Sequence, residues 1–157
     1  MKSCPYPIEK LLGQARPMIL LDRVESYEDG RVKAVVGVRE DSPFLDNGSI
    51  PAYVALEYMA QTIAAYSGLQ QIENGGQAKI GFLLGTRRLI LLAEAFQLGD
   101  DLIVDAEINF NGGELAAFEC TVTRNGERLA EAQLSVYQPE SPEQFLAQND
   151  GATVNVS

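Results

Sequence analysis

The chain has 157 residues, 46% of them hydrophobic, which suits a single domain with a buried core. Its formal net charge of −10 disfavours a nucleic-acid binder, which needs basic side chains to neutralise phosphates, and disfavours adsorption to an anionic membrane surface. The chain has no histidine, which excludes histidine acid–base catalysis, histidine-paired nucleophiles and histidine-ligated metal sites.

The N-terminal part of the chain predicts a helical turn and then a pair of strands. The apolar spacing of residues 8–13 predicts a short helical turn, and the aliphatic run at 18–21 predicts the opening of a strand. Asp29-Gly30 is a hairpin turn signal, and the alternating residues 31–39 predict the returning strand. A loop rich in Asp, Ser, Pro, Asn and Gly follows at 41–48.

A long helix is predicted from Pro51 to about Ser67, with Gly68 or the pair Gly75-Gly76 ending it. Proline suits the first helical position because its missing N–H would be unpaired there in any case. Apolar residues lie on nearly all faces of this segment. A helix of that kind is expected at the centre of a fold, buried on every side.

Strands fill the rest of the chain up to a polar tail. Five runs rich in β-forming residues are residues 79–84, 88–95, 102–110, 116–123 and 129–137, and Asn125-Gly126 is the strongest hairpin signal among them. The order of elements predicts the α+β class, with a single antiparallel sheet curling around one central helix. We expect one domain over residues 1–138 and a loosely ordered tail over 139–157. Such a sheet leaves an open edge, which a second copy commonly closes.

Cysteine usage and the apolar runs favour a reduced, cytoplasmic protein. Cys4 and Cys120 are too few for a disulfide framework or a thiolate zinc site, so no metal is expected. The first ten residues show no apolar leader. The most apolar stretch, 50–69, is interrupted by Glu57 and Gln61 and falls short of the about 18 residues that span a bilayer.

Glu57 is the most informative residue for function. It lies within the predicted helix, in a segment otherwise apolar, and glutamate is rarely buried without a partner. Burial would raise its pKa toward the range in which a general acid or base works. Tyr53 and Gln61 lie one turn to either side and share its face. Two other interpretations explain a glutamate at this position equally well. Glu57 could lie on an exposed strip of the helix, or it could form an ion pair with an arginine at a subunit contact.

Two features near the helix start are further candidates. Free N–H groups around Ala52 and Tyr53 could hold a carbonyl oxygen that gains negative charge, although an ordinary capped terminus is the commoner case. Asp46 and Asn47 precede the helix and could enter a cleft beside Glu57. Loop Asp and Asn residues more often make local turns.

Arg87-Arg88 is the one adjacent basic pair in the sequence. With Lys79 or Arg16 it could form a basic patch that docks an acidic partner, while two solvated side chains at a strand start are the simpler interpretation. The sequence holds no phosphate-binding glycine loop, no dinucleotide-binding fingerprint and no cluster of metal-ligating residues.

Several stretches carry a resemblance to a known family. Residues 57–61, Glu-Tyr-Met-Ala-Gln, resemble the E-x-M-A-Q helix of the hotdog-fold 3-hydroxyacyl-acyl-carrier-protein dehydratases. Residues 16–24, 42–44, 98–102 and 125–132 resemble further motifs of that family, in the same order, so the likeness covers about residues 8–138. The chain lacks histidine and has a short loop before the helix. In both respects it resembles the divergent dehydratase-like proteins of aryl-polyene clusters.

The resemblance implies a hotdog fold, a dimer with active sites at the subunit interface, and a thioester substrate on the phosphopantetheine of an acyl-carrier protein. No other cofactor is implied. The family's catalytic glutamate falls on Glu57, and its helix-start amide falls on Pro51-Ala52. The loop that carries the family's catalytic histidine is shortened here between Phe44 and Pro51, and a second family histidine position is Gln14.

Three functions remain open at this point. The first is a dehydratase with Glu57 as acid or base, sharing the work with Asp46, Tyr53 or a water. The second is a thioesterase in which Glu57 activates water. The third is a subunit without catalysis that pairs with an active relative or binds an acyl chain. Ala52, Tyr53, Asn47 and Gln61 are the expected substrate contacts, and Arg87 and Arg88 the expected carrier-docking residues. The partner subunit is a second copy or a related hotdog chain.

Overall fold

The computed structural model describes residues 1–13, 18–75 and 82–137. The short elements are β1 (Lys2–Ser3), α1 (Ile8–Leu11), β4 (Ser49–Pro51), the 3-10 helix η1 (Ala52–Val54) and β6 (Ala95–Gln97). The long elements are β2 (Arg23–Glu28), β3 (Arg31–Gly37), α2 (Ala55–Glu73), β5 (Phe82–Leu91), β7 (Asp101–Gly112), β8 (Leu115–Arg124) and β9 (Glu127–Tyr137).

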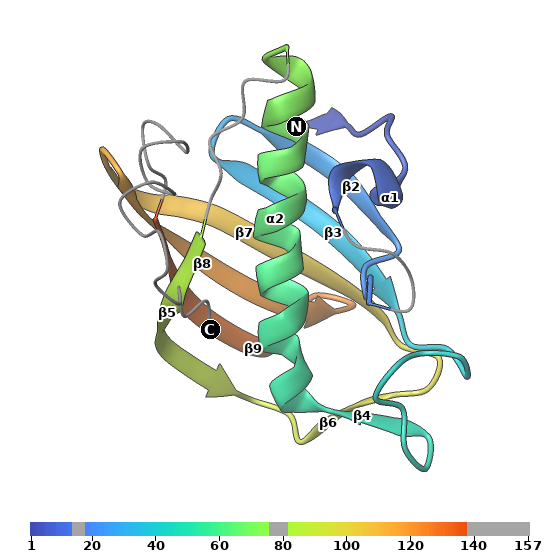
Figure 1. The fold of residues 1–157 in the computed structure, drawn as a ribbon. Coiled ribbons are helices and arrows are strands. Elements are labelled where there is room, and N and C mark those ends of the chain that lie inside the picture. Colours follow the sequence, from blue (N-terminus) through green and yellow to red (C-terminus); the bar gives the residue numbers. More distant parts are fainter. Residues whose placement is uncertain (14–17, 76–81, 138–157) are drawn as a thin grey trace, which may run out of the picture.

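The architecture is the hotdog fold predicted from the sequence. Seven antiparallel strands form one sheet in the order β1-β2-β3-β7-β8-β9-β5. Figure 1 shows α2 lying across one face of this sheet, with the small β4–β6 sheet near the N-terminal end of the helix. The α+β class and the central helix are therefore confirmed.

Alternating apolar residues on the central strands build the core. In β7 the inward residues Leu102, Val104 and Ala106 are fully buried, and the half-buried Ile103 and Asp105 occupy the positions between them. The inward residues of β8 and β9 continue the same layer beneath α2. Because side chains of a strand alternate between its two faces, this pattern fixes which face of the sheet receives the helix.

The helix α2 is longer than predicted, because Gly68 lies inside it and does not end it. A Cβ on Gly68 would overlap the carbonyl oxygen of Leu11, so the glycine allows α1 to approach α2 closely. The helix ends at Glu73, followed by Asn74 and by Gly75 at φ +69°. Of the two predicted ends of the helix, the one at Gly75 is therefore correct and the one at Gly68 is not.

Two strand predictions are wrong in detail. Residues 18–21 form no strand: the side chain of Gln61 binds the carbonyl oxygen of Met18 and the N–H of Leu20, and β2 begins only at Arg23. Residues 82–84 and 88–91 of the two predicted strands belong to one strand, β5, which passes through irregular pairing at Leu83/Gly85 and Thr86/Arg88. Residue Ala95 instead begins β6, which the sequence did not distinguish.

The predicted hairpin turns are confirmed. The Asp29-Gly30 turn joins β2 to β3, and Asn125-Gly126 joins β8 to β9 with both residues at positive φ. Several predictions fall on residues outside those described: Gln14, Arg16, Gly76, Lys79 and the tail over 139–157. The division into a domain over 1–138 and a tail remains a prediction.

Candidate functional site

The start of the central helix is anchored to the small second sheet. Pro51 ends β4, and the N–H of Ala52 donates to the carbonyl oxygen of Glu94 at 3.0 Å. The Ala52 amide is therefore already used within the chain. Tyr53 follows in η1, and its side chain is 64% exposed.

Glu57 lies on the exposed side of α2 in this single chain. The helix is not buried on every side in the single chain, because Glu57 and Ala64 are exposed, and an exposed strip was one of the interpretations left open for Glu57. One of its carboxylate oxygens, Oε1, accepts a hydrogen bond from the Nε2 of Gln61 at 3.2 Å. Tyr53, one turn earlier, is exposed as well, as the shared face predicts.

Gln61 is almost fully buried, with 4% of its surface exposed. Its Nε2 also donates to the carbonyl oxygen of Met18 at 2.8 Å, and its Oε1 accepts from the N–H of Leu20 at 2.8 Å. The amide thus ties the segment before β2 to the helix and holds the carboxylate of Glu57. Both ends of the amide are engaged within the chain, which gives Gln61 a positioning role, and its contact with substrate stays a prediction.

Asp46 and Asn47 form a tight turn before the helix. The backbones of Asp46 and Ser49 exchange hydrogen bonds at 2.8 and 3.2 Å, and Asn47 and Gly48 between them have φ of +51° and +80°. Two consecutive residues at positive φ are typical of a two-residue hairpin turn, for which Asn-Gly is a favoured sequence. Within the described part of the chain no hydrogen bond or ion pair joins Asp46 or Asn47 to Glu57.

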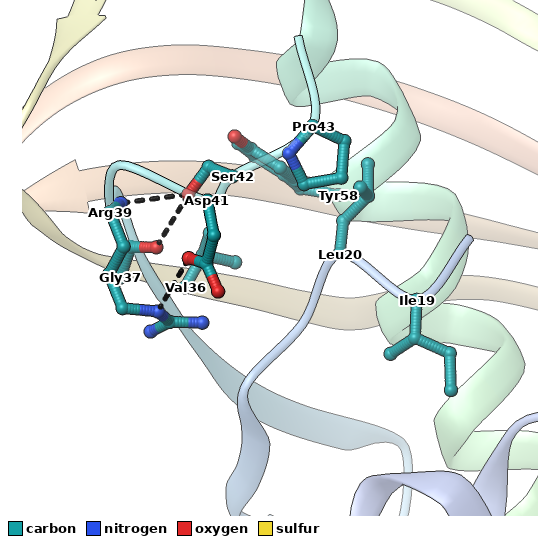
Figure 2. Close-up of a pocket in the computed structure, with 9 residues that line it drawn as sticks. All are labelled: Ile19, Leu20, Val36, Gly37, Arg39, Asp41, Ser42, Pro43 and Tyr58. Atoms are coloured by element: carbon teal, nitrogen blue, oxygen red, sulfur yellow. Dashed lines mark hydrogen bonds and ion pairs between the residues drawn. The ribbon is translucent and has the colours of Figure 1, made fainter. Parts of the chain in front are cut away.

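A small pocket lies between α2 and the loop that follows β3 (Figure 2). Tyr58 projects from α2 toward the loop residues Ser42 and Pro43, and Leu20 lines the pocket opposite. Burial raises the pKa of Tyr58 to about 12, so its hydroxyl keeps its proton at neutral pH. The phenol can donate a hydrogen bond there, but it cannot act as a base near neutrality.

Arg39, which lines this pocket, forms an ion pair with Asp22. The guanidinium of Arg39 binds the carboxylate of Asp22 through both terminal nitrogens, at 2.7 and 2.6 Å. The N–H of Gly37 donates to the same carboxylate at 2.9 Å. The hydrogen bonds and charge of Asp22 raise the pKa of Arg39 further above its already high ordinary value. The pair joins the residue before β2 to the residues after β3, and a bidentate arginine–carboxylate contact is a strong one.

The two arginines expected to dock a carrier lie within β5 and not at a strand start. Both are exposed, and Arg88 pairs with Glu119 across the outer face of the sheet, at 3.1 Å between Nη2 and Oε2. Arg87 occupies the irregular position between Thr86 and Arg88, and among the described residues it has no ion-pair partner. Lys79 and Arg16 lie outside the described residues.

The described residues provide neither a metal-binding cluster nor a membrane-spanning helix. No group of three or more Cys, Asp or Glu side chains in residues 1–13, 18–75 and 82–137 is placed to hold a metal ion. No helix in the same ranges combines the length and the apolar character needed to cross a membrane.

Comparison with protein families identifies the chain. A family model described as ApeP dehydratase, of the ApeP-like group, matches residues 6–147. The chain belongs to the ApeP-like dehydratases. The resemblance to hotdog dehydratases noted from the motifs is therefore confirmed, as is its narrower, histidine-less branch.

Individual relatives agree with this assignment. The chain is similar to a protein of the dehydratase heterocomplex ApeI:P from Xenorhabdus doucetiae, with 31% identity, 92% and 99% of the two chains covered and a TM-score of 0.80. It is 28% identical to the 3-hydroxyacyl-acyl-carrier-protein dehydratase FabZ of Listeria welshimeri, over 81% of this chain and 90% of the relative. A hypothetical thioesterase from Streptococcus pneumoniae, with 16% identity, 74% and 86% of the chains covered and a TM-score of 0.56, shares the fold alone.

In this ApeP-like chain, reasoning from sequence found Glu57 and its neighbours on the helix but missed the residues around Tyr58. The ion pair of Asp22 with Arg39 has no local signal, because the two residues meet only through the pairing of β2 with β3. Tyr58 adjoins Glu57 in sequence, and the helical rotation of about 100° per residue turns it toward the sheet. The helical spacing could have assigned Tyr58 to a different face from Glu57.

Proposed function

We propose that the chain acts as a hydro-lyase of the dehydratase type on a 3-hydroxyacyl thioester, with Glu57 as the acid or base. The substrate would be carried on the phosphopantetheine of an acyl-carrier protein, and no further cofactor takes part. The observation that carries the proposal is the exposed carboxylate of Glu57, held by Gln61 on the helix motif that the family shares. The family match and the FabZ relative support the reaction type.

The proposed reaction removes one water. A base takes the proton from the carbon next to the thioester carbonyl, a double bond forms, and the bond from the 3-carbon to its hydroxyl breaks as an acid protonates the departing oxygen. Glu57 can perform one of these proton transfers. Because the chain has no histidine, the other falls to Asp46, Tyr53 or a group of a partner subunit.

A backbone amide near the helix start would hold the thioester carbonyl, which gains negative charge as the proton leaves. The amide of Ala52 already donates to Glu94, so we place this contact on the amide of Tyr53, the next in η1. Asn47, at the tip of the turn before the helix, would contact the substrate from the other side.

We further propose that a second hotdog subunit covers the side of α2 that carries Tyr53 and Glu57. Both residues are exposed in the single chain, yet proton transfer of this kind works best in a site that excludes water. The relative from Xenorhabdus doucetiae, described as a dehydratase heterocomplex, supports such pairing. The cytoplasmic location, and carrier docking by Arg87 and Arg88, remain predictions.

A subunit without catalysis of its own is the second candidate. The observation that favours it is the missing histidine together with the shortened loop before Pro51. In that case the chain would complete or stabilise the active site of a related hotdog subunit. A thioesterase has support from the fold alone.

The test is the mass of a 3-hydroxyacyl carrier protein after incubation with the wild type and with Glu57→Gln. We expect the wild type to remove one water from the acyl group, and the variant to be at least about a hundredfold slower, since a positioned acid or base contributes about that much. Glu107→Gln, an exposed glutamate on β7, is the matched control and should retain full activity.

Other results would assign other functions. Release of free carrier by the wild type would indicate a thioesterase. An unchanged acyl mass with both proteins would overturn the dehydratase proposal for the isolated chain, and would favour the subunit without catalysis.

A further inference from the structure

The loop 41–48 between β3 and β4 carries Asp46 and Asn47, and an ion pair lies where the loop begins. We propose that Asp22 and Arg39 are positioning residues for the reaction, because their ion pair fixes this loop in place. The inference deepens the proposed function, since it rests on the roles proposed for Asp46 and Asn47.

The backbone of this loop is unfavourable on its own. Phe44 has φ +68° and Asn47 has φ +51°, in the left-handed region that residues other than glycine rarely adopt. The side chain of Phe44 is 59% exposed, so its burial does not compensate for the backbone. A backbone of this kind persists only where contacts with its surroundings hold it.

Apolar packing supports only part of the loop. Leu45 packs against the core, but Ser42 and Pro43 line a cavity of about 150 Å³. Figure 2 shows this cavity between the loop and the residues Tyr58 and Leu20. A void removes the close atomic contacts that would otherwise fix a segment. The first half of the loop therefore depends on other contacts.

Polar contacts around Arg39 supply the missing support. The backbone N–H of Arg39 donates to the Oγ of Ser42 at 2.7 Å, a contact marked in Figure 2. The N–H of Ser42 in turn donates to the carbonyl oxygen of Arg39 at 3.0 Å. The guanidinium of the same arginine binds both carboxylate oxygens of Asp22. Arg39 thus joins the loop to the residue that precedes β2.

Asp22 is itself firmly held. Its backbone N–H donates to the carbonyl oxygen of Val35 at 2.8 Å, and its carboxylate accepts from the N–H of Gly37 at 2.9 Å. Two residues earlier, the N–H of Leu20 is bound by the side chain of Gln61 on α2. The ion pair therefore places the loop relative to both β3 and the central helix.

The chain leaves room for this ion pair at Gly37. A Cβ at this position would lie 2.7 Å from the Nη1 of Arg39 and 3.0 Å from the Oδ2 of Asp22. An alanine at position 37 would therefore displace the guanidinium without removing either charge.

A displaced loop would move the two residues that the proposed reaction takes from it. Asp46 is a candidate for one of the proton transfers, and a proton-transfer group acts in the transition state. Asn47 is one of several proposed substrate contacts. A misplacement of about 1 Å can slow a reaction strongly, so loss of the ion pair should affect the rate more than substrate binding.

The test compares Arg39→Gln with Arg31→Gln. Arg31 forms a second bidentate ion pair, with Asp105 between β3 and β7 at 3.1 and 2.7 Å, in which the loop takes no part. The hydrogen-bonded backbone amides of residues 42–46 should exchange with solvent at least about tenfold faster in Arg39→Gln, and at the wild-type rate in Arg31→Gln.

The same two variants are then assayed with a 3-hydroxyacyl carrier protein. For Arg39→Gln we expect kcat to fall about tenfold and KM to rise by less than about threefold. Arg31→Gln should match the wild type in both constants, although it loses an ion pair of the same kind.

Two further variants separate geometry from charge. Gly37→Ala should reproduce both effects of Arg39→Gln, because it displaces the guanidinium and keeps both charges. Asp22→Asn/Arg39→Gln should have a kcat no lower than that of Arg39→Gln, since the two residues act through one contact. Circular dichroism would establish that the variants are folded. Arg39→Lys, which keeps the charge but loses the bidentate contact, is the milder variant if Arg39→Gln is not.

Unchanged amide exchange in Arg39→Gln would overturn the inference, whatever the turnover. Faster exchange with an unchanged kcat would overturn the role in the reaction, as would an equal fall of kcat in Arg31→Gln. Absence of turnover in the wild type would contradict the proposed dehydratase reaction for the isolated chain. Amide exchange would then still decide whether the ion pair holds the loop, so the two proposals can fail separately.

Discussion

At the scale of single residues, Gln61 connects the proposed catalytic group to the rest of the fold. Its amide joins Met18, Leu20 and Glu57, which lie on a segment and a helix far apart in sequence. A buried amide that satisfies backbone groups at both ends is costly to remove, because those partly buried groups would then lack partners.

We therefore expect Gln61→Met to lower the free energy of unfolding by about 2 kcal/mol, since methionine matches the size of glutamine but leaves the carbonyl of Met18 and the N–H of Leu20 unsatisfied. Dehydration by the folded fraction should also fall, because Glu57 loses its neighbour. Urea unfolding followed by circular dichroism measures the first effect, and the carrier-mass assay measures the second.

Gln71→Met is the matched control, since Gln71 lies on the same helix but is exposed. Its stability should stay within about 0.5 kcal/mol of the wild type. Equal stability of both variants would contradict the positioning role of Gln61.

At the scale of elements, the contact between α1 and α2 explains a glycine that the sequence pattern assigned to a helix end. Glycine inside a helix costs about 1 kcal/mol relative to alanine. Gly68 is nevertheless placed there, because any larger residue would meet the carbonyl oxygen of Leu11 at the end of α1. The packing of two elements outweighs local helix propensity at this position.

We expect Gly68→Ala to destabilise the protein by about 2 kcal/mol, because the added methyl group forces α1 away from α2. Ser67→Ala, at the preceding and half-buried position, should change stability by less than about 0.5 kcal/mol. Thermal or urea unfolding of the two variants gives the comparison. A stabilising Gly68→Ala would show that helix propensity governs this position.

The strand β5 shows why two strands were predicted where one exists. Residues 85–87, which include Gly85 and Arg87, interrupt the apolar pattern, so separate strands were predicted before and after them. In the structure the interruption coincides with irregular pairing to β9, and the strand continues through it.

At the scale of the whole molecule, the single chain exposes apolar residues on β5 and functional residues on α2. A second subunit would cover both the exposed apolar residues of β5 and the exposed side of α2. Small single domains rarely leave a long apolar edge strand open, because it would pair with other chains. Subunit pairing and the active site are thus expected to depend on each other.

We expect Leu91→Lys to weaken subunit pairing by at least about tenfold, because it places a charge in the apolar part of the proposed interface. The fold should survive, since Leu91 is already 41% exposed in the single chain. Sedimentation equilibrium measures the association. Leu98→Lys, at an exposed residue in the turn between β6 and β7, is the control and should associate as the wild type does. Equal association of the two variants would place the interface elsewhere.

The sequence alone determined the class of the fold, the order of its elements, the hairpin turns and the family. These properties depend on patterns between near neighbours: apolar periodicity, Asp-Gly and Asn-Gly turns, and the helix motif at residues 57–61. The tertiary structure alone decided that Glu57 is exposed, that Gln61 is engaged and that β5 lies at an open edge. The physical reason is that these depend on contacts between distant residues, such as Gln61 with Met18, 43 positions apart, for which no local pattern exists.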